Sequence, residues 1–433
     1  MAATKKSYTK LALMILLVGL ISLEIGVFTG GSLNIGNVLM VMSCLMAALL
    51  IYISPRIGAG KRFYLIGPDY VYITYLAWCA LSALWSLDPI GTLTQTIYLG
   101  ALWLGCSAVG MQASPSMAAN YLLRAAVVIA LASFAMIPVS SQLAFQPFSS
   151  TGLPELRGVF AHQLRLGAFM SVCVAFIMIG VLDGSSRSLV GQNAATRWAM
   201  FLILFICMVA ALARSYTAYM LLALPISILL SRRGWIRWTT IVLVGAMVTF
   251  IMIYADQIVG LLGDEGGDVT LSGRTRVWEV TMSAYEEGPA LRGMGYATFN
   301  LPAFDSMWNY YRPPHPHNSF IAALFETGLI GAVLTAVFIL SQIVTVVRSA
   351  NMRRATSLGL FLIIMTFLAS LTGVNYAGKP STLFGLTMLF VAIEGRLVGS
   401  VNSVIRKQRS GARRASKLQS VLPAAPSSSE VTR

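Results

Sequence analysis

The chain has 433 residues, of which 57% are hydrophobic and only 11% are charged, and its mean hydropathy is +0.74. A soluble globular protein has roughly 25% charged residues, so this composition excludes an ordinary soluble domain and indicates a chain that is mostly surrounded by lipid. The net charge of +15 does not indicate a nucleic-acid partner, because the lysines and arginines stand beside apolar runs, where the positive-inside rule for membrane proteins places them.

Apolar runs of helical length recur along the chain. Each lasts about 17–25 residues, as a membrane-crossing helix requires, whereas the strands of a membrane barrel are about half as long and alternate. Because backbone polar groups in hydrocarbon must be paired within a segment or a closed barrel, we predict an all-α membrane protein with about twelve transmembrane helices. The predicted spans are 11–29, 34–54, 70–87, 92–112, 118–139, 164–183, 198–213, 216–231, 238–255, 318–347, 357–373 and 379–398.

The basic residues predict the orientation. With the N-terminus inside, nearly every inner segment contains lysine or arginine, as the positive-inside rule requires. The inner residues are Lys5, Lys6 and Lys10; Arg56, Lys61 and Arg62; Arg187 and Arg197; Arg232, Arg233 and Arg237; Arg348, Arg353 and Arg354; and Arg406, Lys407, Arg409, Arg413, Arg414 and Lys417. Both termini are therefore predicted to be cytoplasmic. The first run is interpreted as an uncleaved helix, because it lacks a clear small-residue cleavage site and further spans follow.

This topology predicts five parts. They are a cytoplasmic N-terminus (1–10), nine spans (11–255), a periplasmic loop (256–317), three further spans (318–398) and a basic cytoplasmic tail (399–433). The tail is rich in Ser, Pro and Ala and is expected to be disordered. The chain has no large central cytoplasmic loop, which argues against a transporter built from two halves.

The five cysteines are predicted to be packing residues. All of them lie in hydrophobic runs, and no two have the spacing of metal ligands. The histidines also lack further ligands at a suitable spacing. We therefore expect neither a metal site nor a cofactor.

Arginines on the predicted outer side go against the charge bias. Arg214 is the most informative, because it stands between two apolar runs only a few residues apart, and an ionisable residue at membrane depth indicates function. Arginine suits a lipid-linked phosphate or diphosphate, since its planar fork binds phosphate through two nitrogens and stays charged. The alternative for any one of them is an interfacial anchor or an ion-pair partner. The set is Arg157, Arg165, Arg214, Arg274, Arg276, Arg292 and Arg312.

The long outer loop has three features in order. A helix is predicted from the stretch Ser272-Gly273-Arg274-Thr275-Arg276-Val277-Trp278, with Ser272 as a candidate cap, to a stop at Gly288-Pro289. A glycine-rich turn follows at 292–296, which is no phosphate-binding fingerprint because no strand precedes it. The aromatic residues over 299–311 then indicate either a loop at the membrane interface or a platform for sugar rings.

Two of the three histidines stand together at the edge of the tenth span, in His315-Pro316-His317-Asn318. An imidazole that titrates near neutrality is able to accept a proton from a sugar hydroxyl. The alternative interpretation is a structural histidine. Glu326, near the start of the same span, is expected to support the loop.

These residues resemble the O-antigen ligase and Wzy-type polymerase superfamily of bacterial envelope glycan assembly. Its signature is His-Asn (or Ser or Gln), nine residues, Gly, two residues, and Gly or a small set of alternatives. His317-Asn318 followed by Gly328 and Gly331 matches it in full. The resemblance covers roughly residues 70–395 and includes Leu84-Trp85-Ser86-Leu87-Asp88-Pro89, Arg157-Gly158-Val159-Phe160, Arg214-Ser215 and the Ser272–Trp278 stretch.

Within this superfamily the Ser272–Trp278 stretch and the 293–296 turn are most similar to ExoQ-type exopolysaccharide polymerases. One motif departs from that branch: His162-Gln163-Leu164-Arg165-Leu166-Gly167 stands where the branch has His-Lys-Asn-x-Leu-Gly. Arg165 restores a charge one turn along, but a role for His162 stays open.

The resemblance implies a fold of the glycosyltransferase C-like superfamily and a metal-independent transfer in the bacterial inner membrane, with the site facing the periplasm. The donor is an undecaprenyl-diphosphate-linked oligosaccharide, and the acceptor is a glycan hydroxyl. Arg214 and Arg274 (or Arg276) would hold the leaving diphosphate, His317 would orient or deprotonate the acceptor, and inversion would follow. The expected substrate-binding residues are Arg276, Arg157, Arg165, Asn318, His315 and Trp278. A chain-length regulator and other polysaccharide-assembly proteins are further candidate partners.

Three functions remain open at this point. The first is a polymerase that extends a polysaccharide from lipid-linked repeat units, and the second is a ligase that moves finished glycan to lipid A core or to a protein. The third is a flippase or other transporter, which would need ionisable residues within the spans; the chain offers little there beyond Glu24, Arg124 and Glu394.

Overall fold

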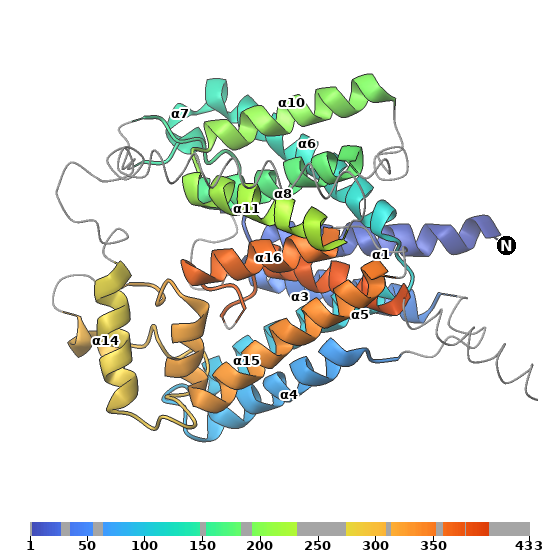
Figure 1. Cartoon of the computed structure of the whole chain (residues 1–433). Coiled ribbons are helices and arrows are strands. Elements are labelled where there is room, and N and C mark those ends of the chain that lie inside the picture. The colour runs from blue at the N-terminus through green and yellow to red at the C-terminus, as the bar shows by residue number, and fades with distance from the viewer. Residues whose placement is uncertain are drawn as a thin grey trace, which may run out of the picture.

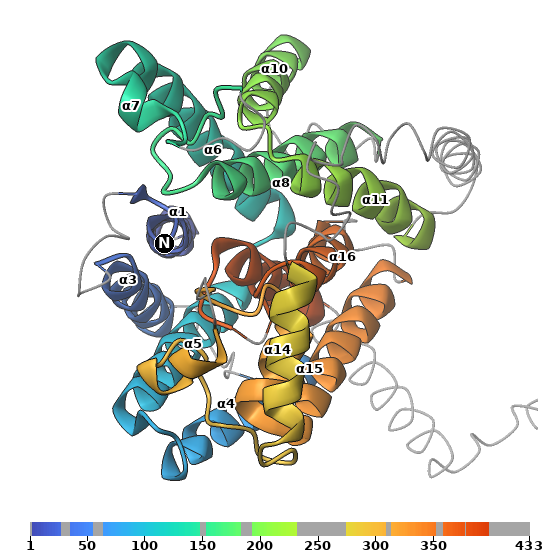
Figure 2. The same cartoon turned by 90° about the vertical axis from the view of Figure 1, so that its left-hand side faces the viewer.

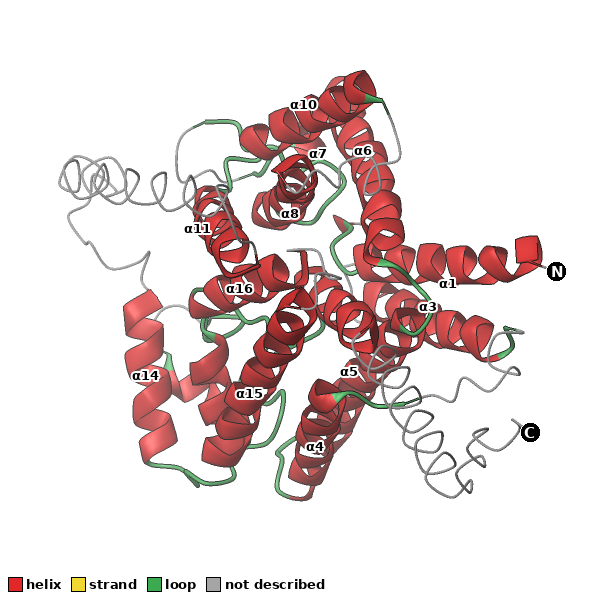
Figure 3. Ribbon diagram, turned by 45° about the vertical axis from the view of Figure 1, so that its right-hand side comes forward, coloured by secondary structure: helices red, strands yellow, loops and turns green. Residues whose placement is uncertain are grey.

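The computed structural model describes residues 2–26, 35–54, 64–147, 153–182, 193–231, 274–308, 313–351, 358–376 and 378–397. Within these ranges every extended regular element is a helix (Figure 3). Two isolated β-bridges, Ile25 with Phe160 and Phe145 with Leu156, are the only strand-like pairs there. The predicted all-α class is confirmed.

The helices follow the predicted apolar runs. They are α1 (Ala2–Ser22), α3 (Ile35–Tyr52), α4 (Gly67–Leu81), η1 (Ser82–Leu84), α5 (Pro89–Gly110), α6 (Pro115–Val139), α7 (Ser141–Ala144), α8 (Gln163–Leu182), α10 (Ala194–Ala210), α11 (Arg214–Ser231), α14 (Arg274–Glu286), η3 (Pro302–Met307), α15 (Ser319–Asn351), α16 (Leu358–Leu371) and a helix over 382–397. Each predicted run overlaps one of them except 238–255, which lies outside the described residues. The number of spans and the side of the long loop remain predictions.

Several of these helices suit a lipid environment. Four of them, α3, α6, α8 and α15, are long and apolar enough to cross a membrane, and α1, α10 and α16 contain shorter apolar stretches. Large apolar side chains such as Val128 and Leu202 are exposed on the helix surfaces, where water would disfavour them and lipid does not. The chain is therefore a multi-pass membrane protein.

The helices pack side by side in a bundle, and α14 lies across one end of it (Figures 1 and 2). We call this end the α14 end; the first residues of α1 lie at the opposite end (Figure 1). Helix α15 packs on α4, α14 and α16, while α8 packs on α10 and α11. All five cysteines are unpaired and buried between the helices, as expected for packing residues.

Capping residues define where several helices begin. The Asp88 side chain accepts a hydrogen bond from the Gly91 amide at 2.9 Å, with Pro89 as the first residue of α5. The Asn193 side chain does the same for the Thr196 amide at 2.8 Å, at the start of α10. Both caps pair amides that a helix leaves without an internal partner.

A buried ion pair joins three helices at the opposite end. Arg396 and Asp69 are 3.0 Å apart, and both side chains are almost fully buried. Trp103 and Ser107 donate further hydrogen bonds to Asp69 at 2.8 and 3.0 Å. The pair and its hydrogen bonds connect α4 and α5 to the helix over 382–397. This contact was not expected from the sequence.

Helix α15 is broken at Gly328, a glycine of the family signature. Its φ of 67° and ψ of −170° are not helical, and glycine adopts a positive φ without steric cost. A Cβ at this position would lie 2.4 Å from the Leu291 carbonyl oxygen, so the break admits the turn that precedes Tyr296. The Gly295 amide donates to the Glu326 carbonyl at 2.8 Å, and the Phe299 amide donates to the Glu326 carboxylate at 3.3 Å. Glu326 therefore supports the loop, as predicted.

The same turn contacts the motif at 84–89. The Arg292 guanidinium lies 5.5 Å from the centre of the Trp85 ring. A Cβ at Gly295 would lie 2.7 Å from the Ser86 Cβ, and the Tyr296 amide donates to the Ser82 hydroxyl at 3.0 Å. Two motifs that are about two hundred residues apart thus form one packed layer beneath the α14 end.

Candidate functional site

Four helices begin at the α14 end with predicted site residues in or beside their first turn. Arg165 is in the first turn of α8, Arg214 opens α11 and Arg274 opens α14. His317 and Asn318 directly precede α15. The first amides of a helix have no internal partner, and the helix dipole is positive there. Together with the guanidinium groups, this arrangement favours a bound anion.

His315 and His317 contact each other. Their ring centres are 4.2 Å apart, and the His317 amide donates a hydrogen bond to Nδ1 of His315 at 3.2 Å. The indole Nε1 of Trp278, on α14, donates to the Pro316 carbonyl between them at 3.0 Å. His317 itself has a φ of 55°, which is uncommon for a residue with a side chain.

Burial and the positive charges around the histidines favour the neutral form of both imidazoles. Burial lowers the pKa of His315 to about 3, and nearby basic groups add to the effect: His317, Lys379, Arg165 and Arg274. Burial also lowers the pKa of His317, with a further contribution from Arg274. A neutral imidazole has a free lone pair, which a general base needs.

Asn318 caps α15. Its side-chain oxygen accepts hydrogen bonds from the amides of Phe320 and Ile321 at 2.9 and 3.2 Å, and its side-chain nitrogen donates to the Leu371 carbonyl at 3.2 Å. Asn and Ser are both preferred N-cap residues, which explains their place after the signature histidine. These contacts give Asn318 a structural role; the predicted contact with substrate remains untested.

The segment between α16 and the last described helix also borders the site. It contains Lys379, which was not predicted from the sequence. The Ser319 hydroxyl accepts a hydrogen bond from the Asn375 amide at 2.8 Å, and the Tyr296 hydroxyl donates to the Gly378 carbonyl at 3.0 Å. Lys379 follows this anchored carbonyl, is exposed and acts on His315. Its position at the outer edge of the last predicted span was the available signal.

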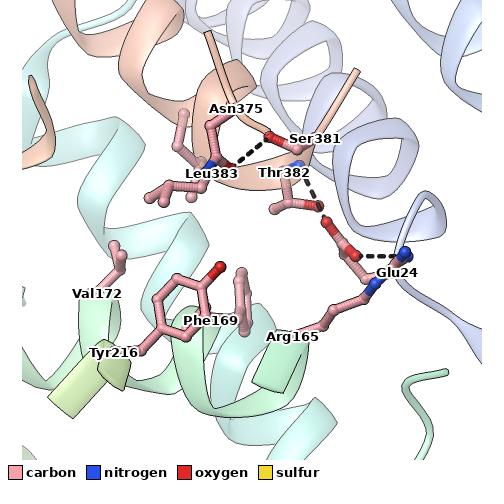
Figure 4. Close-up of a pocket in the computed structure, with 11 residues that line it drawn as sticks. Glu24, Arg165, Phe169, Val172, Tyr216, Asn375, Ser381, Thr382 and Leu383 are labelled. Carbon is pink, nitrogen blue, oxygen red and sulfur yellow. Dashed lines mark hydrogen bonds and ion pairs between the residues drawn. The ribbon is translucent and has the colours of Figure 1, made fainter. Parts of the chain in front are cut away.

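A pocket opens between α8, α11 and the helix over 382–397 (Figure 4). At its rim Arg165 pairs with Glu24 at 3.0 Å, and the Thr382 amide donates to the same carboxylate at 3.1 Å. Glu24, which was expected within the first span, lies just beyond the end of α1 at Ser22. The other lining residues are Ala168, Phe169, Val172, Tyr216, Asn375, Ser381, Leu383 and Leu386.

The pocket combines a polar rim with an apolar wall. The rim is formed by the Arg165–Glu24 pair and the polar side chains of Asn375 and Ser381, and the apolar residues belong to the successive turns of the helices. Tyr216 interacts electrostatically with Arg165 and with Arg274, so the pocket adjoins the start of α14. Such a shape fits a ligand with a charged or polar end and an apolar end.

Arg157 and His162 are engaged in local structure. The Arg157 guanidinium donates to the carbonyls of Leu143 and Gln142 at 2.9 and 3.4 Å. Nδ1 of His162 accepts the Leu164 amide at 3.2 Å, at the start of α8. Burial lowers the pKa of His162, and Arg165 lowers it further.

The structure brings some of the predicted residues together and leaves others at the margin. Arg165, Arg274 and His317 all act electrostatically on His315, and Arg274 also acts on His317. Arg214 and Arg276 are exposed. Arg214 lies close to the start of α8, since the preceding residue, Ala213, contacts Gly167 so closely that a Cβ there would lie 2.1 Å away. Arg312 and Ser272 are outside the described residues.

No three side chains of His, Cys, Asp or Glu come together as a metal site in the part of the chain that the structure describes. Metal independence remains a prediction.

Comparison with known proteins defines the class. Residues 198–336, which include α14, both histidines and the broken start of α15, match the family model described as O-antigen ligase. Over these residues the chain is similar to the O-antigen ligase family, and the resemblance to the O-antigen ligase and Wzy-type superfamily is confirmed there.

Part of the chain is also similar to one characterised protein. The exopolysaccharide production protein ExoQ of Rhizobium meliloti (strain 1021) is 37% identical over 98 residues. The matched part is 21% of this chain and 22% of that relative's length. The resemblance to the ExoQ-type branch is thus confirmed over about a fifth of either protein.

Proposed function

We propose that the protein is an inner-membrane glycosyltransferase that transfers an undecaprenyl-diphosphate-linked glycan to an acceptor sugar hydroxyl, as the polymerase of an exopolysaccharide or O-antigen. The observation that carries the proposal is the neutral His317 imidazole next to Arg274, at an end of the bundle where helix N-termini and cationic side chains gather. A base and an anion site side by side are the two parts that a transfer from a diphosphate leaving group requires.

The donor would bind with its diphosphate among Arg274, Arg165 and Lys379. These three cations all act on His315, and Arg214 at the start of α11 would extend the set toward α8. The pocket beside Arg165 supports this pose, because it adjoins these cations and is lined by both polar and apolar side chains. Glu24 holds Arg165 in the absence of ligand, and the arriving diphosphate would compete with it.

The transfer is then a single displacement. The acceptor hydroxyl loses its proton to the free imidazole nitrogen of His317 as its oxygen bonds to the anomeric carbon. The bond between that carbon and the diphosphate oxygen breaks with its electron pair on the oxygen, where Arg274 and its neighbours stabilise the growing charge. Attack from the face opposite the leaving group inverts the anomeric configuration.

The predicted topology puts this site on the periplasmic face. The inner positions of the basic segments support a cytoplasmic N-terminus, and the α14 end lies at the other end of the bundle from it (Figure 1). A lipid-linked donor would therefore be used after it has crossed the membrane, and no nucleotide sugar is needed.

A ligase is the second candidate, because the matching family model is described as O-antigen ligase. The chemistry at the donor is the same, and only the acceptor differs. A deletion strain separates the two: a lipid-linked single repeat accumulates when a polymerase is lost, whereas long unattached polymer accumulates when a ligase is lost.

The proposal is tested by replacing Arg214, Arg274 and His317 singly with Ala in the native host. Loss of surface glycan or of polymer length at normal protein levels supports it. The matched control is Arg348→Ala, an exposed arginine near the end of α15, away from the site. Normal glycan from all three site variants would refute the enzyme and favour a transporter.

A further inference from the structure

The backbone at His317 adopts a conformation that its neighbours must impose. A φ of 55° is the left-handed region, which a residue with a Cβ rarely occupies. Such conformations persist where surrounding contacts fix them, and they gather at functional sites. Two contacts meet this requirement here: the His317 amide bonded to Nδ1 of His315 and the Pro316 carbonyl bonded to the Trp278 indole.

We propose that His315 and Trp278 are positioning residues, which together hold the Pro316–His317 backbone in the turn that presents the His317 imidazole to the acceptor, and that neither binds substrate. The proposal rests on the proposed function, in which His317 is the base. It revises the expectation from the sequence that both residues contact the substrate.

His315 suits this role because it stays neutral. Its Nδ1 accepts a hydrogen bond, so the proton of the neutral ring is on Nε2. A protonated imidazole has no acceptor, and the bond would be lost. The basic groups that face His315 from α8, α14, the 372–381 segment and its own segment all oppose its protonation: Arg165, Arg274, Lys379 and His317.

Trp278 suits its role because of its place on α14. It lies four residues after Arg274, so the two side chains stand on the same face of the helix. The indole hydrogen bond fixes this face against the segment that contains His317. This single hydrogen bond thereby sets the spacing between Arg274, which holds the leaving group, and His317, which takes the proton.

The alternative is that Trp278 is a platform for sugar rings. In that case its ring would matter and its Nε1 would not. Trp278→Phe keeps an aromatic ring, although a smaller one, and removes the Nε1 donor, so it separates the two roles. His315→Asn similarly keeps an acceptor near the Nδ1 position, whereas His315→Ala removes it.

The experiment uses the purified full-length protein in lipid nanodiscs, with the undecaprenyl-diphosphate-linked repeat unit extracted from the native host as substrate. A misplaced catalytic group lowers turnover, so we expect Trp278→Phe and His315→Ala to reduce kcat about tenfold or more. Because donor binding is intact, KM should stay within about twofold of the parent value. His315→Asn should recover most of the activity, and Trp198→Phe, an exposed tryptophan on α10, is the matched control.

Two results would overturn the inference. One is unchanged kcat in both Trp278→Phe and His315→Ala while His317→Ala is inactive. The other is a raised KM with kcat preserved, which would assign both residues to substrate binding. Full activity of His317→Ala would instead refute the proposed function itself. If His315→Ala does not accumulate, the contrast between His315→Asn and His315→Leu, which has no acceptor, gives the same test.

Discussion

The two ends of the bundle use charged residues in opposite ways. At the opposite end, Asp69 and Arg396 are buried against each other, and Trp103 and Ser107 complete the hydrogen bonding of the carboxylate. At the α14 end, Arg274 and Lys379 act together on the half-buried imidazole of His315, and the other groups that act on it are also basic.

The difference separates structural charge from functional charge. A buried carboxylate that is already paired and hydrogen-bonded offers little to a ligand, and the pair stabilises one arrangement of helices. At the α14 end Arg165 is paired with Glu24, but cations that gather repel one another, and a bound anion relieves that repulsion. Substitutions should therefore change stability at one end and turnover at the other.

The largest expected effect is on catalysis at the α14 end. His317→Ala removes the group proposed to take the acceptor proton, and general-base catalysis contributes about 10²–10⁴-fold. We expect turnover to fall by that factor while the melting temperature is kept. Transfer assayed in nanodiscs and thermal unfolding of the same preparation check this; a variant that melts early would make His317 structural instead.

The counterpart at the opposite end is Asp69→Asn. This change leaves the Arg396 charge buried without its partner, which costs about 3–5 kcal/mol. We expect a large loss of thermal stability and of protein level but normal turnover per folded molecule. The double variant Asp69→Asn with Arg396→Met removes both charges and should recover part of the loss. Equal stability of the single variant and the parent would contradict the structural role of the pair.

Arg274→Gln should lower kcat and also change its pH dependence. Loss of one preorganised charge at a leaving group is worth about 3–4 kcal/mol. Arg274 and burial both lower the pKa of His317, so the parent enzyme should keep its base deprotonated, and stay active, below the ordinary histidine pKa of about 6.5. Without Arg274 the pKa rises, and the acid limb of the residual activity should move to higher pH. An acid limb that does not move would show that Arg274 does not influence the pKa of His317.

The smallest effect is expected at the break in α15. In Gly328→Ala the new methyl group would lie 2.4 Å from the Leu291 carbonyl oxygen in a backbone conformation that alanine disfavours, at a cost of about 1–3 kcal/mol. Both stability and turnover should fall, because the 291–295 turn must shift. Gly100→Ala is the control, since its Cβ would meet nothing within 4 Å and should be neutral or slightly stabilising.

Much of the fold could be predicted from local sequence. Apolar runs gave the helices, because a membrane span must be apolar along its whole length, and the helix from Arg274 to Glu286 was expected from its stop at Gly288-Pro289. The Asp69–Arg396 pair could not be found in this way, since its partners are more than three hundred residues apart. The break at Gly328 was equally hidden, because it depends on the approach of Leu291 from another segment.

The sequence indicated which residues belong to the candidate site, but it did not indicate the contacts among them. Motif spacing identified His317 and Arg274, whereas the contact between His315 and His317 depends on a backbone turn that no pattern encodes. Arg157 was expected to bind substrate because it is an outer arginine; its guanidinium donates to two carbonyls of α7, a contact that the sequence did not indicate, and its contact with substrate stays a prediction. Lys379 was missed because only arginines were considered on the outer side.

The central claim is that a neutral histidine and an arginine at the α14 end transfer a glycan from a lipid diphosphate. The most direct measurement incubates the purified protein with its undecaprenyl-diphosphate-linked repeat unit and follows both released undecaprenyl diphosphate and the anomeric configuration of the new bond by NMR. We expect one undecaprenyl diphosphate to be released for each glycosidic bond formed, and the anomeric configuration to be inverted. His317→Ala should give neither product. Retained configuration, or equal product from His317→Ala, would contradict it.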